Sequence, residues 1–218
     1  MTSPADVVAF HADYDKHPDD RVRLFRAVAG LLPRPASVLY AGSYIDIAPS
    51  IWFDDVLYVD VDKRAARFFA QEDAVAELVR AKRRSVGQPV EPEPALTFEH
   101  ADYGEPLPVQ DGSVDVLISM YAGFISEHCT RYLRTGGYLV TNNSHGDASM
   151  ASLDPDYTLV AVINSSDDDY QTDTDDLDRY LVPKKGTRPT AEELHEMNRG
   201  AAYTHPAFVY VFRRTPPR

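Results

Sequence analysis

The chain has 218 residues, 44% of them hydrophobic, which is enough for a substantial core and short for two independently stable domains. Its 22 basic and 34 acidic residues give a formal net charge of -12, which disfavours nucleic acid and anionic membranes as partners. The single cysteine, Cys129, excludes an internal disulfide and fits a reducing compartment, and no stretch approaches the roughly 20 apolar residues that span a bilayer. We expect one cytoplasmic domain, whose oligomeric state these features do not predict.

The first third of the chain predicts one helix and two buried strands. Apolar residues at helical spacing within 5–32 indicate a helix, with Asp19 or Asp20 as its cap and Pro33 as its end. Apolar runs at 37–41 and 56–59 read as strands, and the short link between them leaves room only for a brief helix. Four polar or aromatic residues near the start are expected at the surface: His11, Asp13, Tyr14 and His17.

The middle of the chain alternates helices and strands. We expect a helix over 63–84, strands at 96–100 and 114–119, a helix over 123–134 that ends at a glycine pair, and a strand at 138–141. The basic triplet Lys82-Arg83-Arg84 closes the first of these helices, where cations favour the helix dipole, so we interpret it as structural.

The last third predicts strands at 157–163 and 207–213 and a helix over 190–203. Seven aspartates lie between 167 and 178, but the glycine and terminal glutamate of a calcium-binding loop are missing. We therefore predict no metal site there, and a solvated, mobile insertion over 165–189 that could act as a lid.

This order of elements predicts an α/β fold with a doubly wound, mostly parallel sheet in a single domain. In such sheets ligands bind outside the carboxyl ends of the strands. Gly42 follows the first strand, Asp60 and Asp62 follow the second, and Asp102 follows the third. Each alone could be an ordinary turn or a solvated carboxylate, but their joint placement indicates a ligand site.

Two segments carry a resemblance to a known family. They are ADYGEPLPVQDGSVDVLIS at 101–119 and RYLRTGGYLV at 131–140. With the strand-end residues, they make the region 38–141 similar to the class I S-adenosylmethionine-dependent methyltransferases. The resemblance implies a Rossmann-like fold with a helical cap at 1–35, a cofactor-binding half at 36–142 and a substrate side at 143–218.

The resemblance also implies which residues contact S-adenosylmethionine. These are Gly42, Ser43, Asp60, Asp62, Asp102, Tyr103, Ser119 and Met120. Gly42 would lie beside the methionine part, Asp60 would hold the ribose with Asp62 as its competitor, and Asp102 and Tyr103 would contact the adenine. Ser119 and Met120 would line the pocket from the fourth strand.

The first motif of the family departs from its usual pattern in this chain. An acidic residue followed by a glycine-rich loop is typical, whereas here Tyr40 takes the acidic position and Tyr44 and Asp46 take two glycine positions. We expect their side chains to crowd the loop that wraps the amino-acid end of the cofactor.

Catalytic candidates follow the fourth and fifth strands. His145 could act as a base oriented by Asp147, although a loop histidine without a partner is commonly just exposed. Tyr121 is a second candidate, with core packing as its alternative.

Three functions remain open at this point. The first is methyl transfer from S-adenosylmethionine to a small molecule, and the second is a methyltransferase-like binding or assembly module without catalysis. The third is a nicotinamide-dependent enzyme, which the lack of a G-x-G-x-x-G sequence after the first strand disfavours.

Overall fold

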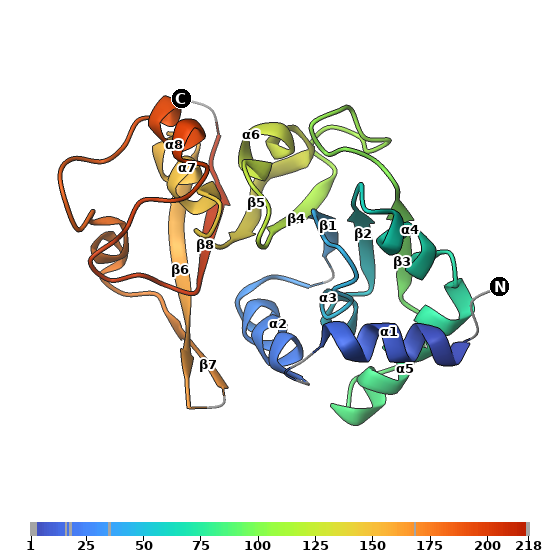
Figure 1. Ribbon diagram of the computed structural model, residues 1–218. Coiled ribbons are helices and arrows are strands. Elements are labelled where there is room, and N and C mark those ends of the chain that lie inside the picture. The colour runs from blue at the N-terminus through green and yellow to red at the C-terminus, as the bar shows by residue number, and fades with distance from the viewer. Residues whose placement is uncertain (1–3, 16, 18, 35, 168, 217–218) are drawn as a thin grey trace.

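The computed structural model describes residues 4–15, 17, 19–34, 36–167 and 169–216 (Figure 1). Its α-helices are α1 Pro4–Tyr14, α2 Asp20–Leu31, α3 Pro49–Trp52, α4 Lys63–Phe69, α5 Glu72–Ser85, α6 Ile125–His128, α7 Asp147–Leu153 and α8 Ala191–Met197. Two short 3-10 helices are η1 Thr130–Tyr132 and η2 Leu177–Leu181. The strands are β1 Ser37–Ala41, β2 Asp55–Val59, β3 Ala95–Glu99, β4 Val114–Ser119, β5 Leu133–Thr141, β6 Tyr157–Ser166, β7 Asp169–Asp173 and β8 Val209–Arg214.

All these strands form one eight-stranded sheet in the order β3-β2-β1-β4-β5-β8-β6-β7. The first five strands of that order pair in parallel, whereas β8 is antiparallel to both β5 and β6, and β7 is antiparallel to β6. The strand order reverses beside β1, so the ends of β1, β2 and β4 meet at the point where α/β sheets bind ligands. The predicted doubly wound, mostly parallel sheet is confirmed.

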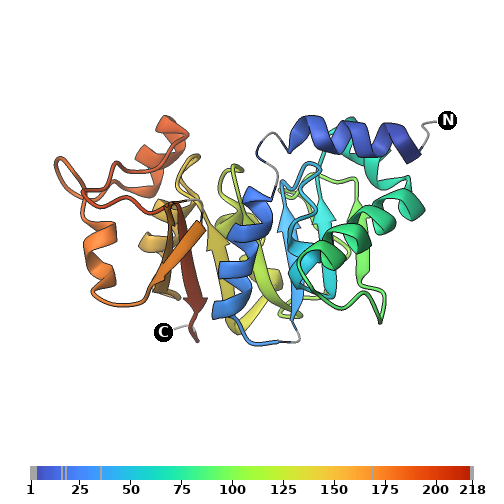
Figure 2. The same ribbon diagram turned by 90° about the horizontal axis from the view of Figure 1, so that it is seen from below.

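Apolar cores lie on both faces of the sheet. Successive residues of β1 alternate between them, so that Val38 and Tyr40 join one core and Leu39 and Ala41 join the other. Figure 2 shows α2 packed alongside the sheet and α1 lying across one end of it. Because the strands are covered on both faces, their sequences are almost continuously apolar.

Four predicted helices differ from the structure. The helix expected within 5–32 is two helices, α1 and α2, and the helix expected over 190–203 is α8, which ends at Met197. The expected helix over 63–84 divides at Ala70 and Gln71, since the acidic pair at the start of α5 favours a new helix N-terminus there. The expected helix over 123–134 is only α6 followed by η1. Gly136 and Gly137 lie inside β5 instead of ending a helix, at an irregularity where a Cβ on Gly137 would lie 2.9 Å from the Asp115 carbonyl oxygen.

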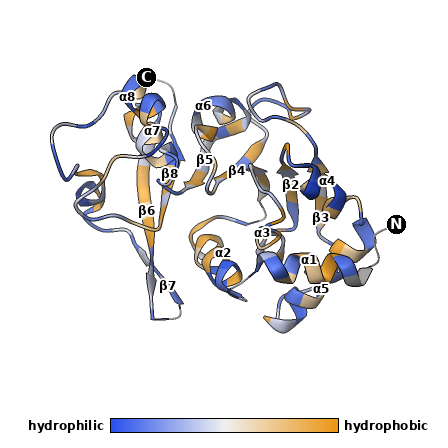
Figure 3. Cartoon of the chain, in the orientation of Figure 1, coloured by the Kyte–Doolittle hydropathy of each residue, from blue (hydrophilic) through white to orange (hydrophobic). Residues whose placement is uncertain are grey.

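The sequence predicts a mobile insertion over 165–189, but part of this acidic segment is ordered as a strand. Residues 169–173 form β7, which pairs with β6, and Figure 3 shows a predominantly hydrophobic β6 beside a hydrophilic β7. Asp169 accepts two hydrogen bonds from Arg26, and the Tyr170 hydroxyl donates to Asp20. These contacts tie β7 to α2, which rules out this strand as a free lid.

The N-terminal residues are more buried than predicted. His11 is 7% exposed and stacks on Phe68 with ring centres 6.0 Å apart, and Tyr14 is half-buried. Burial lowers the pKa of His11. Asp13 and His17 are exposed, as expected. Within the described parts of the chain, no helix is long and apolar enough to cross a membrane.

The predicted caps and basic triplet have structural roles. Asp19 precedes α2, but its side chain accepts from Lys82 instead of capping the helix. Arg83 is 3% exposed and donates to the carbonyl oxygens of Ser50 and Phe53. The interpretation of the triplet as structural is confirmed for Lys82 and Arg83.

Candidate functional site

The turn after β1 brings two strand ends together. The backbone N–H of Gly42 donates to the carbonyl oxygen of Val59 at the end of β2, 2.9 Å away. Gly42 has φ +66°, and a Cβ at this position would lie 2.6 Å from the Cβ of Ala122. Only glycine therefore lets the segment after β4 approach this turn so closely.

Asp60 holds the same turn from the end of β2. Its Oδ2 accepts the backbone N–H of Tyr44 at 2.7 Å, and its Oδ1 accepts that of Asp62 at 2.8 Å. Each carboxylate oxygen keeps a further lone pair, so Asp60 can buttress the turn and still accept a ligand hydroxyl.

Asp62, the predicted competitor of Asp60, has another role. Its carboxylate caps α4 by accepting the backbone N–H of Arg64, and it also pairs with the Arg64 guanidinium. The hydrogen bonds from Arg64 lower the pKa of Asp62 to about 2. Since Asp62 is committed to the helix, Asp60 is the better candidate for a ribose.

The loop after β3 supplies the third strand-end group. Asp102 is exposed and its Oδ1 accepts the backbone N–H of Gly104 at 2.8 Å. The hydroxyl of the adjacent Tyr103 donates to the carbonyl oxygen of Gly123, which links this loop to the segment after β4.

These groups line one cavity of about 850 Å³ at the carboxyl ends of β1 to β4. We call it the carboxyl-edge cavity. Its lining residues are Gly42, Tyr44, Asp60, Val61, Asp62, Asp102, Tyr103, Gly104, Tyr121, Ala122, Gly123, Phe124, His128, His145 and Asn198. The structure thus brings together the strand-end residues that the sequence singled out.

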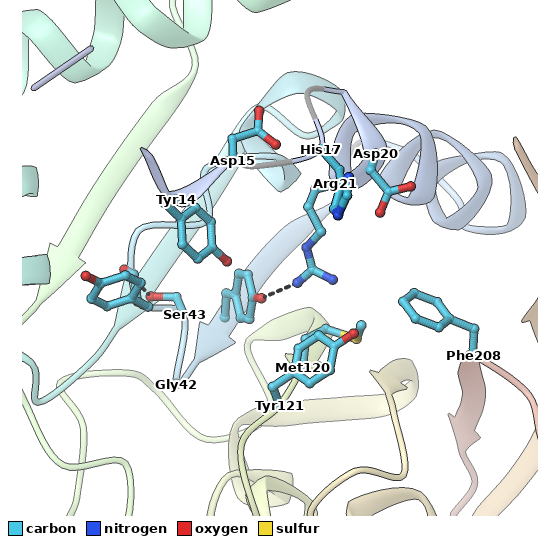
Figure 4. A pocket seen from close by; sticks show the side chains of 12 residues that line it. Tyr14, Asp15, His17, Asp20, Arg21, Gly42, Ser43, Met120, Tyr121 and Phe208 are labelled. Carbon is cyan, nitrogen blue, oxygen red and sulfur yellow. Dashed lines mark hydrogen bonds between the residues drawn. The ribbon is translucent and has the colours of Figure 1, made fainter. Parts of the chain in front are cut away.

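A second cavity, of about 530 Å³, lies beside the first beneath the N-terminal helices (Figure 4). We call it the N-terminal cavity. It is lined by Tyr14, Asp15, His17, Asp20, Arg21, Tyr40, Gly42, Ser43, Tyr44, Met120, Tyr121 and Phe208. Gly42, Tyr44 and Tyr121 belong to both linings, so the two cavities meet at the turn after β1.

The two substituted glycine positions behave differently from each other. Asp46 does not crowd either cavity: it is 2% exposed, and its carboxylate accepts from Arg21 and from the Tyr40 hydroxyl. Tyr44 lines both cavities, with φ +47° and its ring against that of Tyr14 at 5.5 Å. The prediction that both side chains crowd the loop after β1 is therefore wrong for Asp46. Of the two, only Tyr44 places its side chain at the cavities.

The three residues predicted to act in catalysis do not form one centre. His145 lines the carboxyl-edge cavity beside Gly123, and its Nδ1 lies 3.0 Å from the Ser144 hydroxyl. Asp147 does not orient it: this carboxylate is 0% exposed and accepts from the backbone and hydroxyl of Ser126. Tyr121 is 52% exposed, so the alternative of core packing is excluded for it.

Burial raises the pKa of Asp147, against the effect of the Ser119 and Ser126 hydroxyls. A carboxyl whose native pKa exceeds its unfolded value stabilises the fold less as pH rises above about 3.9. We expect Asp147→Asn to keep the Ser126 contacts. As pH rises from 4 to 8, the free energy of unfolding of this variant should increase relative to that of the natural chain. Asp147→Ala, which leaves Ser126 unpaired, should cost about 2 kcal/mol. Urea unfolding at both pH values measures this, and a pH-independent difference for Asp147→Asn would contradict it.

The remaining predicted cofactor contacts are all buried, and they divide between a cavity wall and the core. Ser43 and Met120 are each 2% exposed and line the N-terminal cavity. Ser119 is 0% exposed and lines neither cavity, so the prediction that it contacts a ligand is not supported. Two residues after Leu117 on β4, Ser119 lies on the same face of the sheet as Leu117, in the core that contains Leu117.

Sequence reasoning missed Arg21 and His128. Arg21 reaches the N-terminal cavity from α2, and His128 reaches the carboxyl-edge cavity from α6. Arg21 lies on a face whose other members are apolar, which is the signal that could have revealed it. His128 offered none, since a histidine at a helix C-terminus is typical of any helix.

This chain is similar to known proteins in its structure but not detectably in its sequence. No protein-family model and no curated protein sequence matches the chain. Among solved structures, a provisionally assigned S-adenosyl-L-methionine-dependent methyltransferase of Methanococcus maripaludis superimposes with a TM-score of 0.54. The match has 12% identity and covers 100% of this chain and 96% of the other. This chain has the methyltransferase fold.

Other structures are less similar. An S-adenosylmethionine-dependent methyltransferase of Thermotoga maritima has a TM-score of 0.47 and 12% identity, with 95% of this chain and 97% of the other covered. A chain from a complex of the Haloferax volcanii Trm112 methyltransferase activator with a methyltransferase has a TM-score of 0.46 and 15% identity, with 97% and 98% covered. Several shorter matches span only 44% to 58% of the other chain's length.

Proposed function

We propose that this protein transfers the methyl group of S-adenosylmethionine to a small-molecule acceptor. The observation that carries the proposal is the carboxyl-edge cavity. Gly42, Asp60 and Asp102 line it from the ends of three neighbouring strands of a methyltransferase fold, in the order that the sequence resemblance implies.

The residues of this cavity fit the cofactor. A volume of about 850 Å³ is within the range of small-molecule sites. Asp60 has lone pairs left for ribose hydroxyls, and Asp102 and Tyr103, which the resemblance assigns to the adenine, line the same cavity. The carboxylates of Asp60, Asp62 and Asp102 also favour a ligand with positive charge.

The reaction requires an acceptor aligned with the methyl group. When bound, S-adenosylmethionine supplies a methyl group on a sulfonium, which a nucleophile can attack directly. Because the resemblance assigns the methionine part to Gly42, which lines both cavities, we place the acceptor in the N-terminal cavity, next to Tyr121 at the shared wall. His145 lines the carboxyl-edge cavity and not the N-terminal cavity, so it is then a binding residue, and the exposed His17 is the candidate to take a proton.

Two neighbouring aspartates provide a matched test. We expect Asp60→Asn to weaken binding of S-adenosylhomocysteine at least tenfold, because an amide cannot accept both backbone N–H groups and a ribose hydroxyl. Asp62→Asn keeps an N-capping side chain and should change affinity less than threefold. Calorimetry of both variants measures this, and equal losses would contradict the role of Asp60.

A binding module without catalysis is the second candidate, because Tyr44 takes a glycine position and lines both cavities. Titration of the natural chain with S-adenosylhomocysteine distinguishes the two functions. Binding supports the methyltransferase, whereas no heat of binding up to millimolar ligand would favour the module.

A further inference from the structure

The N-terminal cavity combines apolar walls with one charged side chain. Met120, Tyr121 and Phe208 lie on one side of it, and the guanidinium of Arg21 extends from α2 toward them (Figure 4). Sulfur and aromatic groups of this kind pack against the flat body of a small organic ligand. The side chain of Arg21 is 16% exposed.

Two of the three nitrogens of the Arg21 guanidinium make hydrogen bonds. Nε donates to Asp46 at 2.9 Å, and Nη2 lies 2.7 Å from the same carboxylate and donates to the Tyr40 hydroxyl at 3.2 Å. Nη1 is buried and has no hydrogen-bond partner among the residues that the structure describes. A buried donor of a charged group that lacks a partner is costly, so this nitrogen marks a place for an acceptor oxygen.

Tyr121 covers the guanidinium in the structure. The Arg21 Cζ lies 5.5 Å from the centre of the Tyr121 ring, which is a cation–π contact. Tyr121 is 52% exposed, and its φ of +60° is unusual for a bulky residue. Because half of the ring is exposed, it has room to turn away, which would open Nη1 to a ligand.

Acidic residues of the cavity already have partners of their own. Asp15 lies 3.4 Å from the Lys82 ammonium, and Asp20 accepts from the Tyr170 hydroxyl and lies 3.5 Å from Arg23. Because these carboxylates are neutralised locally, one more negative charge can be accommodated beside Arg21. A phosphate would bring a second negative charge, which the one nitrogen Nη1 does not match.

We propose that the N-terminal cavity binds a methyl acceptor that carries a carboxylate on an apolar or aromatic body, with Arg21 Nη1 as the donor to that carboxylate. This inference rests on the proposed function, because it treats the cavity as the acceptor site. A carboxylate meets a guanidinium through a charge-assisted hydrogen bond, about twice as strong as a neutral one.

Benzoate and benzamide are matched probes, since they share shape and differ in charge. In calorimetry on the natural chain we expect benzoate to bind at least tenfold more tightly than benzamide, and Arg21→Lys to remove most of that difference. Arg26→Lys, on the same helix but paired with the exposed Asp169, should leave it unchanged. In crystals soaked with 4-bromobenzoate, the carboxylate should lie within hydrogen-bond distance of Nη1.

Arg21→Lys could destabilise the fold, because Arg21 pairs with the buried Asp46. A second variant therefore keeps the test valid if Arg21→Lys does not fold. Phe208→Trp narrows the same cavity without touching Asp46, and should weaken benzoate at least tenfold. Benzoate that binds no better than benzamide, does not bind, or lies elsewhere in the crystal would overturn the inference.

The amino-acid end of the cofactor also carries a carboxylate, and a separate comparison identifies which one Arg21 holds. If Arg21→Lys weakened S-adenosylhomocysteine but not 5′-methylthioadenosine, which lacks the amino-acid end, the acceptor assignment would be overturned. Binding of benzoate at Arg21 without any binding of S-adenosylhomocysteine would instead refute the proposed function and leave the carboxylate site standing.

Discussion

Asp46→Ala is expected to lower the free energy of unfolding by about 3 to 5 kcal/mol, since it leaves the charge of Arg21 buried without its partner. The Tyr40 hydroxyl and the backbone N–H of Ala48 lose their acceptor at the same time. The loss should appear in urea unfolding as a lower midpoint with an unchanged slope.

Asp169→Ala is the control for that variant. It breaks a pair in which both side chains are 52% exposed, so it should cost less than about 1 kcal/mol. The double variant Arg21→Met with Asp46→Ala should recover part of the loss, because no charge then remains buried. Equal effects of Asp46→Ala and Asp169→Ala would contradict the stabilising role of the buried Arg21–Asp46 pair.

Gly42→Ala is expected to cost about 3 kcal/mol and to abolish binding of S-adenosylhomocysteine. Part of the cost is the left-handed backbone, with φ +66°, and the rest is the contact of the new Cβ with Ala122 at 2.6 Å. Relief of that contact must move the segment after β4, which lines both cavities. Urea unfolding and calorimetry on the same preparation measure the two effects.

Gly112→Ala separates the two parts of that cost. Gly112 has nearly the same φ, +67°, but a Cβ there meets nothing within 4 Å. It should cost about 1 kcal/mol and leave binding unchanged. Ala122→Gly should restore binding to the Gly42→Ala variant by removing the methyl group that it meets, and a failure of both controls would contradict the close approach.

The sheet could be predicted from the sequence because parallel strands buried on both faces leave continuous apolar runs. The strands at 37–41 and 114–119 agree with the structure to the residue. The strand ends carry the polar groups of the candidate site, so the positions of Asp60 and Asp102 in one cavity could be expected from their places after successive parallel strands.

What the sequence concealed depends on contacts between distant residues. Asp46 turns into the core because Arg21, 25 residues earlier, pairs with it there. The acidic residues of β7 form a strand because β6 and α2 lie beside it. Gly136 and Gly137 serve an irregularity in β5, although a glycine pair after an apolar segment is equally typical of a helix end.

A crystal structure with S-adenosylhomocysteine tests the central claim most directly. The account predicts the adenine beside Asp102 and Tyr103, the ribose hydroxyls on Asp60, and the sulfur near Gly42 and Tyr121, facing the N-terminal cavity. A nucleoside bound anywhere else, or crystals that take up no ligand at millimolar concentration, would contradict it.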